Sequence, residues 1–235
     1  GKSASTVFPF VGAKKDFFLY DAQDIDPKVE ADVAFLALPH GQSAATAHRL
    51  MEAGTKVVDL SADLRLHDVN VYEEWYGEHK APELLPLAVY GLPEIHRDRI
   101  RGANLIANPG CYPTTAILGM APMLKVAEVD TSCPVIDSKS GISGAGRGAK
   151  LNTSFCESGE GFKPYGVIRH RHIPEMEQEI SALAGHEVRV RFTPHLIPTS
   201  RGMVSTIYLP LKAEVSAEDL RQAYVDFYTG EPFVR

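Results

Sequence analysis

One cysteine in this chain has the surroundings that nucleophilic chemistry requires. Cys111 follows the tight turn Asn108-Pro109-Gly110, and Pro113 lies in the first turn of the apolar helix that we predict after it. At a helix N-terminus, unpaired N–H groups favour negative charge and stabilise the thiolate. We therefore expect Cys111 to be a nucleophile with a lowered thiol pKa, although a free cysteine is more commonly a buried structural residue.

Two histidines could supply the acid or base that a cysteine nucleophile needs. His170 and His172 flank one arginine directly before a helix predicted over 173–183. Imidazole titrates near neutral pH, so either residue suits the role, and the sequence does not separate them. We favour His172. A structural pair and a His-x-His zinc site are the alternatives, but the other cysteines and histidines lack paired ligand spacing, so we expect no metal.

Further residues could hold an anionic ligand. A glycine-rich loop follows the strand predicted over 134–138, and its Gly141-x-x-x-x-Gly146 spacing resembles a P-loop. Arg147-Gly148 replaces the lysine and hydroxyl of that motif, so we predict backbone N–H groups beside a flat or anionic ligand, or else a flexible loop. Arg65 and Arg201 are candidate anion clamps, since guanidinium matches phosphate and carboxylate oxygens.

The elements that must position these residues follow two different patterns. In the first half, strand-length apolar runs at 33–38, 56–60 and 105–107 alternate with other segments, and a helical segment at 44–53 lies between the first two. This order predicts a parallel sheet with crossover helices. Residues 64–103 read as a loop-rich stretch with short helices. In the second half, apolar and charged residues alternate over 187–192 before a strand-like stretch at 203–211, which is typical of an antiparallel sheet with one covered face.

Composition narrows the class of protein. The chain has 235 residues and a net charge of −6, which argues against non-specific nucleic-acid binding. It has no apolar run of the ~20 residues that a membrane span needs and no signal-peptide pattern. Three cysteines, an odd number, indicate a reducing compartment. We therefore expect a cytoplasmic protein without membrane or nucleic-acid partners.

A series of motifs then occurs in the order expected of one family. They are Leu38-Pro39-His40-Gly41, Asp59-Leu60-Ser61-Ala62-Asp63-Leu64-Arg65, Tyr90-Gly91-Leu92-Pro93-Glu94, Asn108-Pro109-Gly110-Cys111-Tyr112-Pro113-Thr114, Ser140-Gly141-Ile142-Ser143-Gly144-Ala145-Gly146-Arg147, His170-Arg171-His172-Ile173-Pro174-Glu175 and Phe192-Thr193-Pro194-His195-Leu196. The chain resembles the N-acetyl-γ-glutamyl-phosphate reductases, whose relatives are the aspartate-semialdehyde dehydrogenases and, by mechanism, the glyceraldehyde-3-phosphate dehydrogenases.

The resemblance implies an α/β fold in two domains. A doubly wound Rossmann-type NADP-binding domain, incomplete here, would occupy residues 1–128 and end in the Cys111 helix. An α+β mixed-sheet domain for substrate binding and dimerisation would occupy residues 129–235. The family's opening strand with its Gly-x-x-Gly-x-x-Gly turn and its C-terminal segment have no counterpart in this sequence, so we expect an internal fragment of a longer chain.

The resemblance also implies a reaction in arginine biosynthesis. Cys111 would attack the acyl phosphate to form a thioester, NADPH would reduce it to N-acetyl-glutamate semialdehyde, and His172 or His170 would act as acid and base. Cofactor-binding residues would be Pro39, His40, Gly41, Ser61, Ser143, Gly144 and Gly146. Substrate-binding residues would be Arg65, Asn108, Arg147 and Arg201. The enzyme would be a homodimer or homotetramer. The alternatives are another acyl phosphate, such as aspartyl phosphate, or a non-catalytic assembly fragment.

Overall fold

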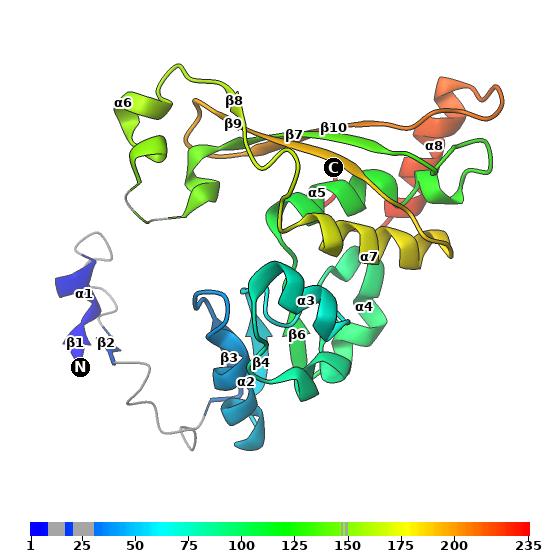
Figure 1. The fold of residues 1–235 in the computed structure, drawn as a ribbon. Coiled ribbons are helices and arrows are strands. Elements are labelled where there is room, and N and C mark those ends of the chain that lie inside the picture. Colours follow the sequence, from blue (N-terminus) through cyan, green and yellow to red (C-terminus); the bar gives the residue numbers. More distant parts are fainter. Residues whose placement is uncertain (9–16, 21–30, 147, 149) are drawn as a thin grey trace.

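The first half of the chain contains a four-stranded parallel sheet. The computed structural model describes residues 1–8, 17–20, 31–146, 148 and 150–235 (Figure 1). The strand order is β3-β4-β6-β5, and every neighbouring pair is parallel. These strands are β3 (Val33–Leu36), β4 (Lys56–Asp59), β5 (Val89–Tyr90) and β6 (Leu105–Ala107). The predicted parallel sheet is confirmed, whereas the short strand β5 lies in a stretch predicted to contain only loops and helices.

Helices connect these strands and cover the sheet. They are α2 (Ser43–Glu52), α3 (Val69–Tyr76), the 3₁₀ helix η4 (Pro82–Leu87) and α4 (Pro93–Arg101). Side chains of α2 and η4 are buried against strand residues such as Val57 and Leu105 in one apolar core. Before this unit, β1 (Lys2–Ser3) and β2 (Phe18–Leu19) pair antiparallel around α1 (Ala4–Val7).

The second half forms a mixed sheet in the order β10-β7-β9-β8. The strands are β7 (Val135–Gly141), β8 (Lys163–Pro164), β9 (Arg191–Ile197) and β10 (Met203–Tyr208). β7 pairs parallel with β9 and antiparallel with β10, and β8 pairs antiparallel with β9. The mixed sheet implied by the resemblance is confirmed. The alternating pattern at 187–192 wrongly indicated an antiparallel sheet, because such a pattern reports a covered face and not the strand direction.

Two helices cover one face of this mixed sheet (Figure 1). They are α5 (Cys111–Met120) and α7 (Ile173–Ala184), and their buried residues share a core with Ile136 and Phe192. Short helices and the longer α8 complete the unit: η5 (Met123–Lys125), η6 (Ile142–Ala145), η7 (Leu151–Thr153), α6 (Phe155–Ser158) and α8 (Ala217–Tyr228). The predicted division at residue 128 remains a proposal. The Cys111 helix, which precedes that division, packs in the second core.

The second core makes α5 and α7 neighbours, and this packing positions the chemistry. Cys111 is the first residue of α5, and His172 is the N-cap residue of α7. The two helix N-termini therefore bring the predicted nucleophile and the predicted acid–base residues to one place. No helix in the described ranges is long and apolar enough to cross a membrane.

Candidate active site

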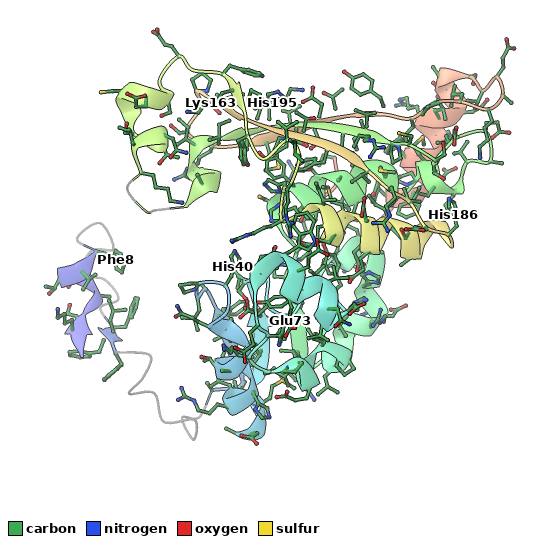
Figure 2. All side chains as sticks on the ribbon, viewed as in Figure 1. Phe8, His40, Glu73, Lys163, His186 and His195 are labelled. Atoms are coloured by element: carbon green, nitrogen blue, oxygen red, sulfur yellow. The ribbon has the colours of Figure 1, made fainter. Side chains whose placement is uncertain are left out.

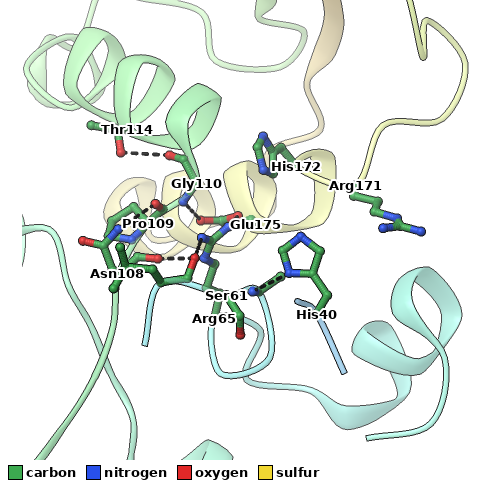
Figure 3. A network of polar contacts seen from close by, with 12 residues as sticks. His40, Ser61, Arg65, Asn108, Pro109, Gly110, Thr114, Arg171, His172 and Glu175 are labelled. Carbon is green, nitrogen blue, oxygen red and sulfur yellow. Dashed lines mark hydrogen bonds and ion pairs between the residues drawn. The ribbon is translucent and has the colours of Figure 1, made fainter. Parts of the chain in front are cut away.

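A buried polar network holds the turn before Cys111 in place (Figure 3). Glu175, in the first turn of α7, is 1% exposed. Its Oε1 accepts hydrogen bonds from the Gly110 N–H (2.8 Å) and the Tyr90 hydroxyl (2.8 Å). Its Oε2 lies 3.4 Å from Arg65 Nη1. Burial raises the pKa of Glu175, and Arg65 and the Gly110 amide oppose that effect. The carboxylate thus ties the nucleophile turn to α7.

Gly110 is required because three side chains approach its Cα. A Cβ at this position would lie 2.7 Å from His172 Nε2, 3.0 Å from Arg65 Nη1 and 3.0 Å from Glu175 Oε2. A Cβ that lies closer than 3.0 Å to another atom displaces that atom, and here the neighbouring side chains are buried or packed. The glycine of the Asn-Pro-Gly-Cys motif therefore permits His172 to lie against the turn that carries the nucleophile.

We predict that Glu175→Gln lowers the free energy of unfolding by about 3–5 kcal/mol, because it leaves the buried Arg65 guanidinium without its counter-charge. Urea unfolding followed by circular dichroism measures the change. Glu218→Gln is the matched control, since Glu218 pairs with Arg221 on the surface of α8 and should change stability by less than about 1 kcal/mol. Equal effects of the two substitutions would contradict the structural role of Glu175.

Both candidate histidines are neutral at physiological pH. Burial lowers the pKa of His172 to about 3, with contributions from His170, Arg65 and His40. Burial and Arg171 lower the pKa of His170 to about 4. His170 Nδ1 accepts the backbone N–H of His172 (3.1 Å), which leaves the proton of the neutral ring on Nε2. His172 Nδ1, in contrast, is buried without a hydrogen-bond partner among the described residues.

The thiol pKa differs from our sequence-based expectation. Burial raises the pKa of the Cys111 thiol above its ordinary value, even though the backbone N–H groups of Cys111 and Tyr112 and the Arg65 charge act to lower it. The prediction of a lowered pKa was therefore wrong. The helix N-terminus acts in the expected direction, but the desolvation of the thiolate is larger. Neither nearby histidine adds a positive charge at neutral pH.

We predict that alkylation of Cys111 by iodoacetamide accelerates about tenfold per pH unit between pH 7 and pH 8.5. Only the thiolate reacts, and its fraction rises tenfold per unit below the thiol pKa. The experiment uses a Cys133→Ser/Cys156→Ser background, because both of those cysteines are also exposed. A plateau in the rate below pH 8 would show that the thiol pKa is lowered after all.

Cys111 and both histidines line a cavity of about 460 Å³ between the two halves of the chain. Its lining also includes His40 and Tyr76 from the first half. The cations on its walls are Lys150, Lys163, Arg169 and Arg171, and no carboxylate is among the described lining residues. Figure 2 shows His40 beside the first sheet and Lys163 on β8. Such a cavity fits an anionic molecule whose reactive carbon lies over Cys111.

The predicted substrate-binding residues lie in different settings. Arg65 is buried, and its nitrogens donate to the Asn108 carbonyl (2.7 Å), the Leu60 carbonyl (2.9 Å) and Glu175. These contacts support positioning of the Cys111 turn by Arg65. Arg201 lies in the exposed turn between β9 and β10. Arg147 lies outside the described residues.

The predicted cofactor-binding residues lie at two edges of the site. Residues 39–41 and Ser61 follow β3 and β4, at the carboxyl ends of parallel strands where dinucleotides bind. Residues 143–145 belong to η6 and Gly146 follows it directly, and Gly144 lines the same cavity as His40. A Cβ at Gly144 would lie 2.8 Å from Ser140 Oγ, so the absence of a side chain lets these two lining residues pack closely.

The N-terminus of α2 is already capped by the protein. The N–H groups of Gly41, Ser43 and Ala44 donate to the Asp63 carboxylate at 2.7, 3.0 and 3.1 Å. These amides are therefore used for folding and are not free to bind a phosphate. His40 Nδ1 accepts the Ala62 N–H (3.0 Å), so the same contacts fix the ring that faces the cavity.

Sequence reasoning missed several residues of the site. Glu175 is part of the His170–Glu175 motif, but its pairing with Arg65, 110 residues away, leaves no signal in the local sequence. Arg171 lies between the two candidate histidines and lines the cavity. Tyr76, from α3, contributes the facing wall. In the described ranges, no cluster of histidine, cysteine and carboxylate side chains has the arrangement of a metal site.

Comparison with known proteins places both halves in one group. Residues 1–103 match the family described as semialdehyde dehydrogenase, NAD binding domain, and residues 111–235 match semialdehyde dehydrogenase, dimerisation domain. The N-acetyl-gamma-glutamyl-phosphate reductase of Moorella thermoacetica is 57% identical over 205 residues, which cover 87% of this chain and 59% of the relative. That of Citrifermentans bemidjiense is 50% identical over 236 residues, which cover 100% of this chain and 68% of the relative.

Solved structures agree on the fold. Aspartate semialdehyde dehydrogenase II from Vibrio cholerae superposes with a TM-score of 0.66 at 18% identity and covers 89% of this chain and 64% of that one. An aspartate semialdehyde dehydrogenase from Candida albicans, solved with NADP, gives 0.53 at 16% identity and covers 83% and 55%. The expected architecture, a Rossmann-type domain and a mixed-sheet domain, is thus confirmed.

Proposed function

Because this chain belongs to the N-acetyl-gamma-glutamyl-phosphate reductase family of semialdehyde dehydrogenases, we propose that the enzyme it forms reduces N-acetyl-γ-glutamyl phosphate to N-acetyl-glutamate 5-semialdehyde in arginine biosynthesis. The chain spans about 59 to 68% of the length of those two relatives. The observation that carries the proposal is a cysteine at a helix N-terminus, beside neutral histidines, in a cavity lined by cations and free of described carboxylates.

The first half-reaction needs only residues of this chain. The Cys111 thiol gives its proton to an imidazole, for which we favour His172, and the sulfur attacks the carbonyl carbon of the acyl phosphate. The bond between that carbon and the phosphate oxygen breaks, and phosphate leaves with the bonding electrons. A thioester on Cys111 remains. An anionic substrate in the cavity raises the pKa of a nearby imidazole, so it makes the proton transfer from the thiol easier.

The second half-reaction converts the thioester to the aldehyde. A nicotinamide cofactor, for which we propose NADPH, supplies a hydride when it is bound. The protonated imidazole gives its proton to the carbonyl oxygen as the carbon gains the hydride. The carbon–sulfur bond then breaks while the resulting hydroxyl returns that proton to the imidazole, which releases the aldehyde and the Cys111 thiolate. We propose that Ser143, Gly144 and Gly146 would lie beside the nicotinamide, and that residues 39–41 and Ser61 would lie along the remainder of the cofactor.

The match of residues 111–235 to a dimerisation domain supports an oligomer, and we propose a homodimer or homotetramer. We further propose that the enzyme acts in the cytoplasm, where its nicotinamide cofactor is available.

Oxidation of NADPH by the complete enzyme tests the proposal. We expect turnover of N-acetyl-γ-glutamyl phosphate to exceed that of β-aspartyl phosphate by at least about 10²-fold in kcat/KM, since a buried polar site discriminates strongly between ligands. Faster turnover of β-aspartyl phosphate would favour the alternative substrate. Lack of turnover with either compound would contradict a reductase.

A further inference from the structure

The active-site cavity contains an arginine that the protein does not neutralise. Arg169 donates to the Glu74 carbonyl (2.8 Å) and lies 3.4 Å from its carboxylate. The guanidinium of Arg171, in contrast, makes no ion pair with any carboxylate in the described part of the chain, although it lines the same cavity. A cation that faces a cavity and lacks a counter-charge is ready to receive an anion.

An aromatic platform holds Arg171 in this position. The guanidinium carbon lies 5.3 Å from the centre of the Tyr76 ring, and the Tyr76 hydroxyl donates to the Arg171 carbonyl (3.2 Å). Tyr76 stacks in turn on Tyr72 (5.1 Å), whose hydroxyl donates to Asp63 (2.9 Å). A guanidinium that packs against an aromatic face keeps the N–H groups at its edge free for a ligand.

On this basis we propose that Arg171 binds the phosphate group of the acyl-phosphate substrate, which deepens the proposed function and rests on it. Arg171 adjoins both histidines in the chain, and the phosphate is bonded to the carbon that Cys111 attacks. Of the other cavity cations, Lys150 is the N-cap residue of η7 and Lys163 lies on β8, both in the second unit. These two lysines are then available to bind a carboxylate at the other end of the substrate.

This assignment gives Arg171 a role in bond breaking. As the carbonyl carbon gains the bond to sulfur, the departing phosphate oxygen takes the electrons of the broken bond, and its negative charge increases. A guanidinium in contact with that phosphate stabilises the charge where it develops. In the reverse direction, inorganic phosphate attacks the thioester, the acyl phosphate forms and the Cys111 thiolate leaves, so Arg171 would bind inorganic phosphate as a substrate.

The reverse reaction of the complete enzyme provides the test, because the KM for inorganic phosphate can be measured separately. We expect Arg171→Ala to raise that KM about 10–100-fold, the usual effect of a charge-assisted hydrogen bond, with smaller changes in the KM values for the aldehyde and NADP⁺. Arg171→Lys should fall between the wild type and Arg171→Ala, since it keeps the charge but loses the fork. Arg101→Gln, a surface change on α4, is the matched control for lost charge.

A second measurement does not require turnover. Inorganic phosphate should protect Cys111 of the wild type from iodoacetamide, and Arg171→Ala should raise the phosphate concentration needed for half protection by a similar factor. If the wild type were inactive but phosphate still protected Cys111, the proposed function would be refuted and the phosphate-binding site would still be supported. Unchanged phosphate KM and unchanged protection in Arg171→Ala, or a rise only in the KM for aldehyde or NADP⁺, would overturn the assignment of Arg171.

Tyr76 acts through Arg171 and is a positioning residue. We expect Tyr76→Leu to raise the phosphate KM severalfold in the wild-type background and to have no added effect in Arg171→Ala. Additive effects of the two substitutions would mean that Tyr76 influences phosphate binding by another route.

Discussion

Replacement of Cys111 by serine should reduce turnover by the complete enzyme at least roughly 10⁴-fold while leaving the fold unchanged, since loss of a nucleophile removes the covalent route. The serine hydroxyl has a far higher pKa than the thiol and so provides almost no oxyanion in this desolvated site. Cys111 contributes little to stability because it lines the cavity and is not among the buried residues of either apolar core. Steady-state kinetics and the unfolding midpoint together measure the two halves of this prediction.

Cys133→Ser and Cys156→Ser are the matched controls for that experiment. Both residues are free and exposed, and neither is among the residues that line the cavity. Each variant should retain wild-type kcat. Turnover by Cys111→Ser within tenfold of the wild type would exclude a thioester on this residue, and a lowered unfolding midpoint would make its loss of activity uninformative about the nucleophile.

Local sequence patterns were sufficient for the parallel sheet of the first half and for the placement of the nucleophile, but not for β5 or for the strand directions of the second sheet. Short apolar runs separated by helical segments predict a parallel sheet, because crossover connections are the only short route between parallel strands. The Asn-Pro-Gly-Cys turn predicts a cysteine at a helix start because proline and glycine have fixed positions at such boundaries. The structure places Cys111 at the first position of α5, as this local reasoning requires.

Tertiary packing decided what the local patterns could not. Arg65 and Glu175 are separated by 110 residues, so their pairing leaves no signal in either segment. The same limit explains the thiol pKa: a helix N-terminus is visible in sequence, whereas desolvation depends on what packs around the sulfur. Arg65, predicted from the sequence to bind substrate, donates to the Asn108 carbonyl and to Glu175 beside the nucleophile turn, whereas Arg171 lines the cavity without an ion pair among the described residues.

The roles of the two histidines are separable by their hydrogen bonds. His170 Nδ1 is occupied by a backbone N–H, which fixes the tautomer and makes Nε2–H a donor. His172 Nδ1 is buried without a partner among the described residues, and a buried unsatisfied nitrogen in an active site indicates a functional group. His172 Nε2 also approaches the Cα of Gly110, directly before the nucleophile. These contacts favour His172 as the residue that exchanges the proton with Cys111.

Substitution of His172 by asparagine should therefore lower kcat roughly 10²–10⁴-fold, the usual contribution of a general acid–base, with little change in KM. His170→Asn should mainly raise the substrate KM, because it removes a donor from the cavity wall. In His172→Asn the remaining activity should rise with pH up to the thiol pKa, since solvent hydroxide must then deprotonate Cys111. A large loss of kcat in His170→Asn together with a raised KM in His172→Asn would show that the two roles are exchanged. Nearly normal kinetics in both variants would show that the two histidines are structural.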